Sequence, residues 1–528
     1  MRRKRLRNKG NEMNPAIHAD VVIIGSGAGG GTVAAALAPL VAQGKRVLIL
    51  EKGARIDPKQ LTGAEVASAS LLYGHGGAHP TADHTVTLAY GEALGGSTMV
   101  YTGTSMTPPE RVISGWNLPG LSYDDVVERT ARFAVQNNAS FIPDNLINDN
   151  NRLFQKGCEA LGREARQFPI NVRGCRGSSL CNLGCPNNAK QGTAQVQIPA
   201  AQAAGVEVVT RAEVRGLRVG GRGGILDVFV DDRPHPHGSQ SEWAPGHHVV
   251  HASSVVVAAG AIHSPALLLR SGLAGDLPAI GRFWTCHPAH ILAGEHDHVI
   301  SNYVGHPKSF VWEERVEAER YFLESCMYFP FITAKNLTGF GADHERLMAA
   351  YERLQMILVL ACDDALPEQR VAIDVSGNPV IHYKLMPKTI EAMVRGTRAA
   401  AEIFFAAGAD AVHAPSARPT LIERSEQADL NTRITTAQFL PGTISVSAAH
   451  LMGGCRMGAT PRDSVTTSRG QVHGHDWLFV ADASLFPTAL EINPYLTIMA
   501  VADHVAEAVA DREGQTVPRG GQAVPAAS

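Results

Sequence analysis

The sequence predicts an α/β fold, and three observations carry the prediction. First, the apolar run Val21–Ile24 leads through a glycine-rich turn into an alanine-rich segment, Thr32–Ala42, and a second apolar run, Val47–Leu50. This is the strand–helix–strand order of a parallel βαβ unit. Second, the later stretches Ser253–Gly272 and Trp477–Glu513 each repeat a strand, a turn and a helix. Third, the 528 residues are 45% hydrophobic, which suffices for two or three domains with a large core.

The first glycine-rich turn has the spacing of a dinucleotide-binding site. Gly25, Gly27 and Gly30 form G-x-G-x-x-G after the strand, and Glu51 closes the next strand. We expect Gly25 to permit the tight turn, Gly27 to let a pyrophosphate approach the backbone, and Gly30 to let helix and strand pack closely. The helix N-terminus would face the phosphates, and the Glu51 carboxylate would bind the ribose hydroxyls. The pattern predicts a Rossmann-like domain for FAD or NAD rather than NADP.

Composition and charge narrow the class of protein. The formal net charge of −3 gives no reason to expect nucleic acid as a partner. The basic run at positions 1–10 is interpreted as part of a flexible tail, 1–14, with Met13 as an alternative start. No apolar segment follows that run and no stretch of about 18 apolar residues exists, so we expect a cytoplasmic protein without a membrane span. The eight cysteines do not predict a dense disulfide framework.

Two further stretches favour FAD over NAD. The glycine-rich stretch YGEALGGSTMVYTGTSMTPPE, 90–110, has no evident purpose in a simple NAD dehydrogenase. Near the C-terminus, Asp482 follows a strand, and Asn493 and Pro494 precede a long amphipathic helix. Pro494 suits the first helical position, where its missing N–H costs nothing.

A single histidine stands in an apolar, glycine-rich stretch, SAAHLMGGCRMG, Ser447–Gly458. His450 is either a core histidine with a satisfied hydrogen bond or a residue held there to move a proton, and the stretch alone favours the first reading.

Taken together, these motifs resemble those of the glucose–methanol–choline (GMC) oxidoreductases. The resemblance rests on GSGAGG, Gly95-Gly96-Ser97, AAGAIHSPALLLRSG, SAAHLMGGCRMG, and LFVADASLFP followed by EINPYLTIMA, with weaker echoes in GWNLPGLSYDDV and GRFWTCHP. It implies a flavoprotein that oxidises an alcohol. It also implies a discontinuous FAD-binding domain, 15–120, 190–285 and 445–513, and a second, substrate-binding domain of antiparallel sheet and helices, 121–189 and 286–444. The segment 514–528 would be a second flexible tail.

The resemblance also implies roles for individual residues. His450 would be the base or orient the substrate hydroxyl, and Asn493 would hold the substrate oxygen, since an amide cannot take the proton. The helix that begins at Pro494 would aim its N-terminus at the flavin and stabilise the reduced, anionic form. The expected cofactor-binding residues are Gly25, Ser26, Gly27, Gly30, Glu51, Gly95, Gly96, Ser97, Val214, Ala259, Asp482, Ala483, Asn493 and Pro494.

The chain departs from the family pattern in two places. Tyr101 stands where the family often has asparagine, so covalent attachment of FAD is not assumed. The substrate domain matches poorly, and within it Glu324 stands among apolar residues in YFLESCMYFP. It is either a third catalytic residue, as the resemblance to cholesterol-oxidase-like and long-chain-alcohol-oxidase-like members implies, or a surface acid on an edge strand. The same apolar stretch hints at a lipophilic substrate.

Three clustered cysteines, Cys175, Cys181 and Cys185, precede a proline. Their spacing resembles that of flavoprotein dehydrogenase subunits that carry a 3Fe–4S cluster, although a four-cysteine cluster would need one more thiolate. Packed or paired thiols are the alternative. With a cluster, the protein would pass electrons to a partner protein. Without one, oxygen or another acceptor would reoxidise FAD. Lyase or decarboxylase chemistry and non-enzymatic FAD binding are the remaining alternatives.

Overall fold

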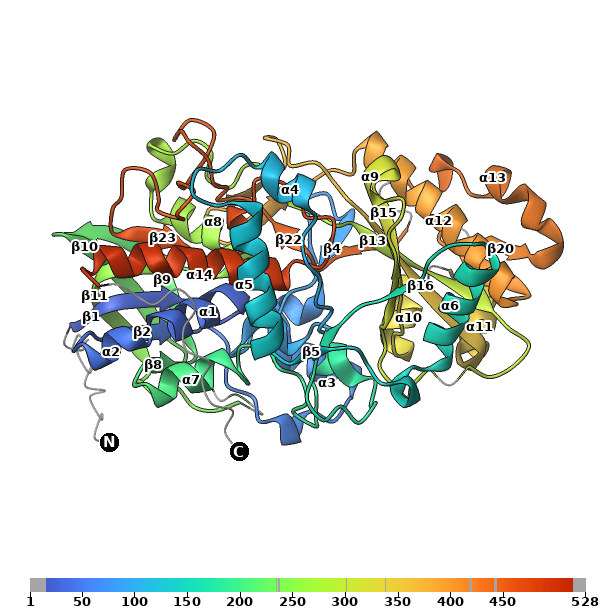
Figure 1. Ribbon diagram of the computed structural model, residues 1–528, viewed down its shortest axis with the longest axis horizontal. Coiled ribbons are helices and arrows are strands. Elements are labelled where there is room, and N and C mark those ends of the chain that lie inside the picture. Colours follow the sequence, from blue (N-terminus) through green and yellow to red (C-terminus); the bar gives the residue numbers. More distant parts are fainter. Residues whose placement is uncertain are drawn as a thin grey trace, which may run out of the picture.

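The computed structural model describes residues 16–515, apart from 234, 236–237, 301, 338, 417–419 and 441–443. The predicted tail 1–14 lies outside the described residues, as does the predicted tail 514–528 beyond Gln515. The described chain forms an elongated molecule with one large sheet towards each end (Figure 1).

The first sheet has seven strands, in the order β8-β2-β1-β11-β10-β9, with β23 beside β11. Strands β8, β2, β1, β11 and β23 run parallel, and β9 and β10 continue the sheet antiparallel. Buried strands with apolar residues on both faces are what a parallel sheet covered by helices requires. The bounds are β1 Ile17–Ile24, β2 Val47–Leu50, β8 Glu207–Val209, β9 Ala212–Gly220, β10 Gly223–Val230, β11 Gly246–Val257 and β23 Leu478–Val480.

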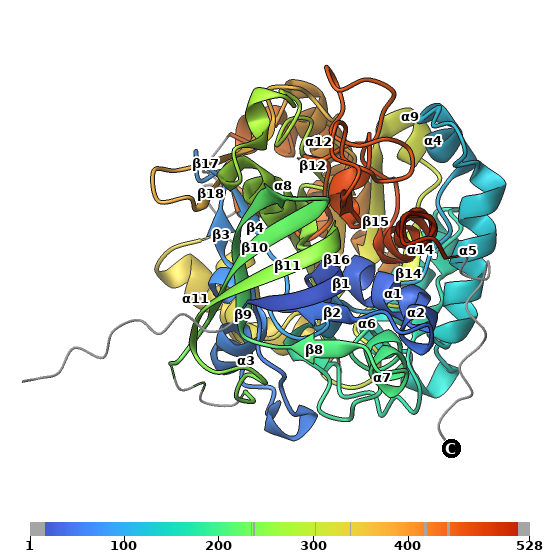
Figure 2. The same cartoon turned by 90° about the vertical axis from the view of Figure 1, so that its left-hand side faces the viewer.

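Helices cover both faces of this sheet. α1 (Ala28–Leu37), α5 (Tyr123–Gln136) and α14 (Tyr495–Arg512) lie on one side, and α8 (Gly260–Arg270) lies on the other (Figure 2). α5 is tied to α14 by Arg129, which is 4% exposed and bonds to the side chains of Asp125, Asp503 and Glu507.

The first helix differs from its predicted bounds. We expected one helix over Thr32–Ala42, but α1 begins at Ala28, directly from the glycine turn, and ends at Leu37. A separate short helix, α2, covers Pro39–Ala42. Pro39 has no N–H to bond within α1, so the helix is interrupted before it. The last helix begins at Tyr495, with Pro494 as its N-cap residue rather than its first helical residue.

The second sheet has ten strands and is antiparallel except where β4 runs parallel to β21. Its order is β3-β4-β21-β13-β16-β15-β14-β6, with β19 beside β13 and β20 beside β19. This confirms the mixed architecture that the resemblance implied. The bounds are β3 His79–Pro80, β4 Val86–Leu88, β6 Arg166–Gln167, β13 Ala289–Glu295, β14 Phe310–Trp312, β15 Tyr321–Ser325, β16 Leu354–Ala361, β19 Ala411–Ala414, β20 Thr420–Glu423 and β21 Val446–Ala448.

Helix α12 (Pro387–Ala407) covers one face of the second sheet, with α6 (Asp149–Ala160) beside it (Figure 1). The packing is close: a Cβ on Gly396 of α12 would lie 2.6 Å from Val359 and 3.1 Å from Tyr321. The odd-numbered residues of β15 therefore face α12, and the even-numbered ones, Phe322 and Glu324, face the opposite way. Smaller helices complete this half: α10 Pro330–Asn336, α11 Ala342–Ala349 and α13 Leu430–Arg433.

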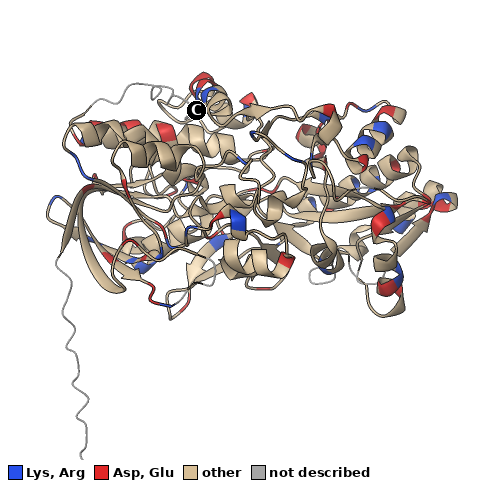
Figure 3. Ribbon diagram, turned by 90° about the horizontal axis from the view of Figure 1, so that it is seen from below, with Lys and Arg blue, Asp and Glu red and all other residues tan. Residues whose placement is uncertain are grey.

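Lys and Arg residues are interspersed with Asp and Glu residues along the described ribbon (Figure 3). None of the described helices is long and apolar enough to cross a bilayer.

Candidate active site

The first glycine turn has the geometry that its spacing predicts. Gly25 has φ +98°, and a Cβ there would lie 2.4 Å from the carbonyl oxygen of Ala258. A Cβ on Gly30 would lie 2.0 Å from the carbonyl oxygen of Gly25, so helix and strand touch at this point. Gly27 is different: the nearest atom to its Cβ position is the Cα of Gly96, 3.9 Å away. Gly25 and Gly30 are therefore required by protein packing, whereas Gly27 leaves space above the helix N-terminus.

The Glu51 carboxylate holds this turn together. One oxygen accepts hydrogen bonds from the backbone N–H of Ser26 (2.9 Å) and from its hydroxyl (2.6 Å). The other accepts from the N–H of Gly53 (2.7 Å). The Ser26 hydroxyl oxygen in turn accepts from the N–H of Gly95 (2.9 Å), so the loop Gly95–Ser97 is joined to the turn. Burial raises the pKa of Glu51, against the opposing effect of these donors. A carboxylate has about four lone-pair sites, so one remains for a further donor.

Asp482 connects the end of β23 to the start of α8. Its carboxylate accepts hydrogen bonds from the N–H of Gly260 (2.9 Å), the hydroxyl of Ser264 (2.5 Å) and the N–H of Ser484 (2.8 Å). Asp482 also acts as a turn former at the end of a strand, as its alternative interpretation stated, because its bond to Ser484 caps the short turn that follows. The same bonds place Ala259 and Ala483 beside it.

The N-terminus of α14 has no side-chain cap. Thr497 in its first turn has a buried hydroxyl without a hydrogen-bond partner, as has the Oδ1 of Asn493 just before it. The ring of Tyr101 packs edge-on against Tyr495, with centroids 5.0 Å apart, and its hydroxyl bonds to Asn171. Tyr101 thus supports the start of this helix.

His450 lies in a chain of three side chains. Its Nδ1 is 3.0 Å from the Nδ1 of His287, and its Nε2 is 3.2 Å from the Nδ2 of Asn493. The Nε2 of His287 bonds to the carbonyl oxygen of Leu490. The strand pair β12 (Thr285–Cys286) and β22 (Leu451–Met452) produces this arrangement, because its register sets His287 beside His450.

The hydrogen-bond chain assigns the tautomer of His450. The carbonyl of Leu490 can only accept, so the Nε2 of His287 must carry its proton and donate. Burial lowers the pKa of His287 to about 4, so its Nδ1 is an unprotonated acceptor. His450 therefore donates from Nδ1, and its unprotonated Nε2 accepts a hydrogen bond from the amide N–H of Asn493.

His450 is held in the neutral form. Burial, together with nearby His287 and Lys308, lowers its pKa well below the ordinary value. The basic form of His450 is therefore present at neutral pH and is lost only when the pH falls through this lowered pKa.

His287 was not predicted as a site residue from the sequence. Its signal was the echo GRFWTCHP, which ends one residue after it, but nothing in the linear chain connects position 287 with position 450.

Glu324 is not a surface acid. It is fully buried in β15, between β14 and β16, so the alternative of an exposed acid on an edge strand is wrong. Its carboxylate forms an ion pair with Lys308. No hydrogen bond joins it to His450 among the described contacts. Strand pairing on both sides, which the sequence pattern did not reveal, accounts for the difference.

Two further predicted cofactor-binding residues, Val214 and Ser97, lie in β9 and in the glycine-rich loop. Val214 is 5% exposed in β9, where it pairs with Val228 of β10. The Ser97 hydroxyl oxygen accepts a hydrogen bond from the N–H of Gly91 (3.0 Å).

The three clustered cysteines face one small cavity together with Lys190 and His306. Cys181 Sγ is 3.8 Å from the Nε2 of His306. Burial raises the pKa of Cys181 to about 12 and also raises that of Cys175. All eight cysteines, each within the described chain, are unpaired. The described residues contain no group of three His, Cys, Asp or Glu side chains that could hold a metal ion. These thiols therefore do not fit an iron–sulfur cluster as they stand.

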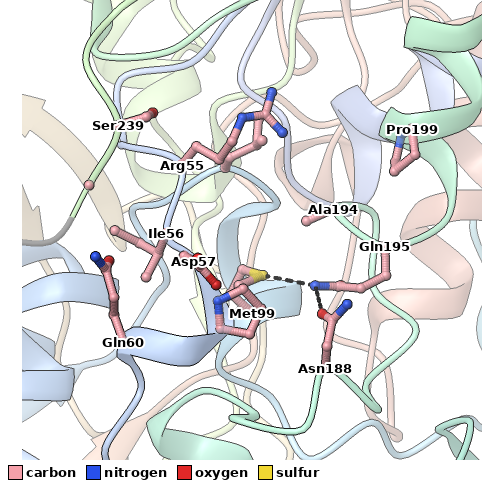
Figure 4. A pocket seen from close by; sticks show the side chains of 13 residues that line it. Arg55, Ile56, Asp57, Gln60, Met99, Asn188, Ala194, Gln195, Pro199 and Ser239 are labelled. Carbon is pink, nitrogen blue, oxygen red and sulfur yellow. Dashed lines mark hydrogen bonds between the residues drawn. The ribbon is translucent and has the colours of Figure 1, made fainter.

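A cavity of about 600 Å³ lies apart from His450, between the loop after β2 and the segment that leads into α7 (Gln197–Ala203) (Figure 4). Gln195 crosses one side of it and donates a hydrogen bond to Asn188 (3.2 Å). None of its lining residues is a predicted site residue, so we do not assign the chemistry to it.

Comparisons with known proteins show which family this chain is similar to. The family models of the N- and C-terminal parts of GMC oxidoreductases match residues 69–289 and 369–502. An uncharacterized GMC-type oxidoreductase of Mycobacterium tuberculosis is 31% identical over 93% of this chain and 75% of its own length. A long-chain-alcohol oxidase of Arabidopsis thaliana is 27% identical over 94% of this chain and 67% of its own. The structure of a formate oxidase of Aspergillus oryzae, studied for its FAD modification, superposes with a TM-score of 0.68 at 16% identity, over 94% of this chain and 99% of that one.

Proposed function

The chain belongs to the GMC oxidoreductase family, and from this premise we propose that it oxidises the CH–OH group of an alcohol to a carbonyl with FAD as the hydride acceptor. As a member of this family with oxidase relatives, it is an FAD-dependent oxidoreductase. The observation that carries the proposed mechanism is the unprotonated Nε2 of His450, which accepts a hydrogen bond from the amide of Asn493 where the substrate hydroxyl would bind.

The described residues fit FAD at two helix N-termini. Above Gly27 there is room for the pyrophosphate, and α1 begins there without a side-chain cap. α14 also lacks a side-chain cap, and the buried Oδ1 of Asn493 and hydroxyl of Thr497 are unsatisfied. Buried polar atoms are rarely left without a partner, so a polar group is expected against them. FAD, when bound, supplies the acceptor for the two electrons and the hydrogen that leave the alcohol carbon.

The chain's own residues handle the proton. His450 Nε2 accepts the hydroxyl proton of the alcohol while the C–H hydrogen leaves as hydride, so the carbon–oxygen bond becomes a carbonyl. Asn493 donates its amide N–H to the substrate oxygen and holds it beside His450. His287 fixes the imidazole in the tautomer that this transfer needs. The positive end of the α14 dipole favours negative charge in front of the helix.

The reduced cofactor must pass its electrons to oxygen or to a partner protein. We also propose that the protein is located in the cytoplasm. Because the thiols of Cys175, Cys181 and Cys185 do not fit an iron–sulfur cluster, we do not propose a 3Fe–4S relay to the acceptor. The contact chain at His450 favours oxidation over lyase chemistry or mere FAD binding, because it prepares a base for a hydroxyl.

The visible spectrum of the purified holoenzyme, recorded before and after anaerobic addition of alcohols, tests the proposal. A two-banded flavin spectrum that bleaches with one class of alcohol supports it. A protein without flavin, or a flavin that no alcohol bleaches, would overturn it. Broad absorbance beneath the flavin bands, with iron found by metal analysis, would contradict the conclusion that the three thiols do not fit an iron–sulfur cluster.

A pair of histidine variants adds a specific test. His450→Ala should slow anaerobic flavin reduction by about 10²- to 10⁴-fold, the usual contribution of a general base. His298→Ala is the control, because its side chain is 60% exposed on the surface. Equal reduction rates in the two variants would exclude His450 as the base.

A further inference from the structure

The ion pair between Lys308 and Glu324 is buried among apolar residues of the second sheet. The side chain of Glu324 is fully buried and that of Lys308 is 9% exposed. The strand neighbours of Glu324, Val311 and Leu358, are buried hydrophobic residues. Taking two charges out of water costs several kcal/mol per ion, and an apolar pair of similar volume is often no less stable. The burial of these two charges therefore needs an explanation other than their contribution to stability.

The hydrogen bonds of this pair are incomplete. Only one oxygen of Glu324 bonds to Lys308, and the other, Oε1, is buried without any partner. Lys308 Nζ carries three protons, and Glu324 is its one hydrogen-bond partner among the described side-chain contacts. The pair thus offers one unsatisfied acceptor beside unsatisfied donors. Unpaired buried polar groups of this kind are costly unless something completes them.

The pair faces the candidate active site. Phe322 and Glu324 project from the same face of β15, the face turned away from α12. The ring of Phe322 packs edge-on against the ring of His287, with centroids 5.6 Å apart. Two residues of strand span about 7 Å, so Glu324 lies roughly that far along the sheet from the point beside His287. Lys308 is also near enough to His450 to contribute to its lowered pKa.

We infer that Lys308 and Glu324 bind a second hydroxyl group of the substrate, remote from the hydroxyl that is oxidised. A hydroxyl can donate to Glu324 Oε1 and accept from Lys308 Nζ, which completes both residues at once. The two charges already balance, so a neutral group fits better than an ammonium or a carboxylate. The substrate class is then a diol or polyol whose two hydroxyls are separated by a short chain or a ring. This inference rests on the proposed alcohol oxidation and narrows its substrate from the lipophilic alcohol suggested by the sequence.

Matched alcohols test the inference on the holoenzyme. We would compare kcat/KM for α,ω-diols from propanediol to octanediol with that for the n-alkanol of equal length. The expected diol-to-alkanol ratio reaches about tenfold or more at one chain length and falls on either side, because a site that binds a hydroxyl penalises the analogue that lacks it. A flat ratio near the statistical value for all lengths overturns the inference while leaving the proposed oxidation intact. If no alcohol reduces the flavin, the proposed function itself fails.

A charge-balanced double variant gives the second test. Lys308→Met together with Glu324→Leu removes both charges, so neither is left buried alone. We expect the maximum in the diol-to-alkanol ratio to disappear. The matched control is Arg163→Met with Glu402→Leu, which removes an ion pair between the segment after α6 and α12 and should keep the wild-type ratio. An unchanged maximum in the Lys308/Glu324 double variant would show that the pair is only structural. Should that variant fail to bind flavin, the wild-type ratio alone decides.

Discussion

Replacing His287 by leucine should slow catalysis without removing the base. The bond between His450 Nδ1 and His287 Nδ1 is 3.0 Å long, and His287 is 1% exposed. Leucine cannot accept this bond, so His450 loses the contact that keeps its Nε2 unprotonated, and the carbonyl of Leu490 loses its donor. A buried polar group left unsatisfied costs about 1–3 kcal/mol. If the same free energy is added to the activation barrier for proton transfer, the rate constant falls about 5- to 150-fold.

The control is His287→Gln. A glutamine can accept from His450 Nδ1 with its carbonyl and donate to the Leu490 oxygen with its amide, so it preserves both bonds of the wild-type chain. The assay is the rate of anaerobic flavin reduction in a stopped-flow instrument at saturating alcohol, with KM measured separately. We expect the limiting rate to fall in the leucine variant, KM to change little, and glutamine to restore much of the loss. Equal limiting rates in the leucine, glutamine and wild-type proteins would refute the tautomer argument.

Three further predictions follow from the fold and from burial. Gly27→Ala should fold but bind FAD at least about tenfold more weakly. Gly29→Ala should instead reduce the yield of soluble protein, because its Cβ would lie 1.8 Å from the Ala481 oxygen. FAD titration measures the first effect and expression level the second. Equal FAD affinity of Gly27→Ala and wild type would contradict the role of Gly27. Arg129→Met should destabilise the protein by about 1.5–3 kcal/mol, since Asp503 would lose its buried partner and keep only Arg132. Urea unfolding measures this, and a loss below about 1 kcal/mol would contradict the role of Arg129 in joining α5 to α14. Acid should destabilise the protein through buried histidines whose folded-state pKa values lie below the unfolded value near 6.5. Because the unfolded state binds more protons, this stability is complete above pH 6.5 and is lost towards pH 4, by about 2 kcal/mol per histidine at pH 5. A melting temperature that does not fall between pH 7.5 and pH 5 would exclude this acid destabilisation by buried histidines. The histidines are His287, with a pKa lowered to about 4, His290, lowered to about 3, and His306, lowered to about 4.

The sequence by itself determined the local parts of this protein. The strand β2 has the bounds that its apolar run predicts, and Gly25 and Gly30 have the close contacts that their spacing predicts. These features depend on residues near one another in the chain, where strand period, glycine conformation and helix capping act directly. The boundary of α1 was less accurate, because a helix can start from a glycine turn without a polar cap and Pro39 interrupts it.

Tertiary structure alone decided how the chemical groups meet. His450 has a defined tautomer only because the pairing of β12 with β22 brings His287 beside it, 163 residues away in the chain. Glu324 is buried only because β15 lies between two other strands, and it pairs with Lys308, which precedes the neighbouring strand β14. Burial and hydrogen-bond direction set the charge and proton position of these groups, and both depend on neighbours that no local pattern specifies. The sequence therefore identified His450 as a candidate, while the fold decided which of its nitrogens can act as a base.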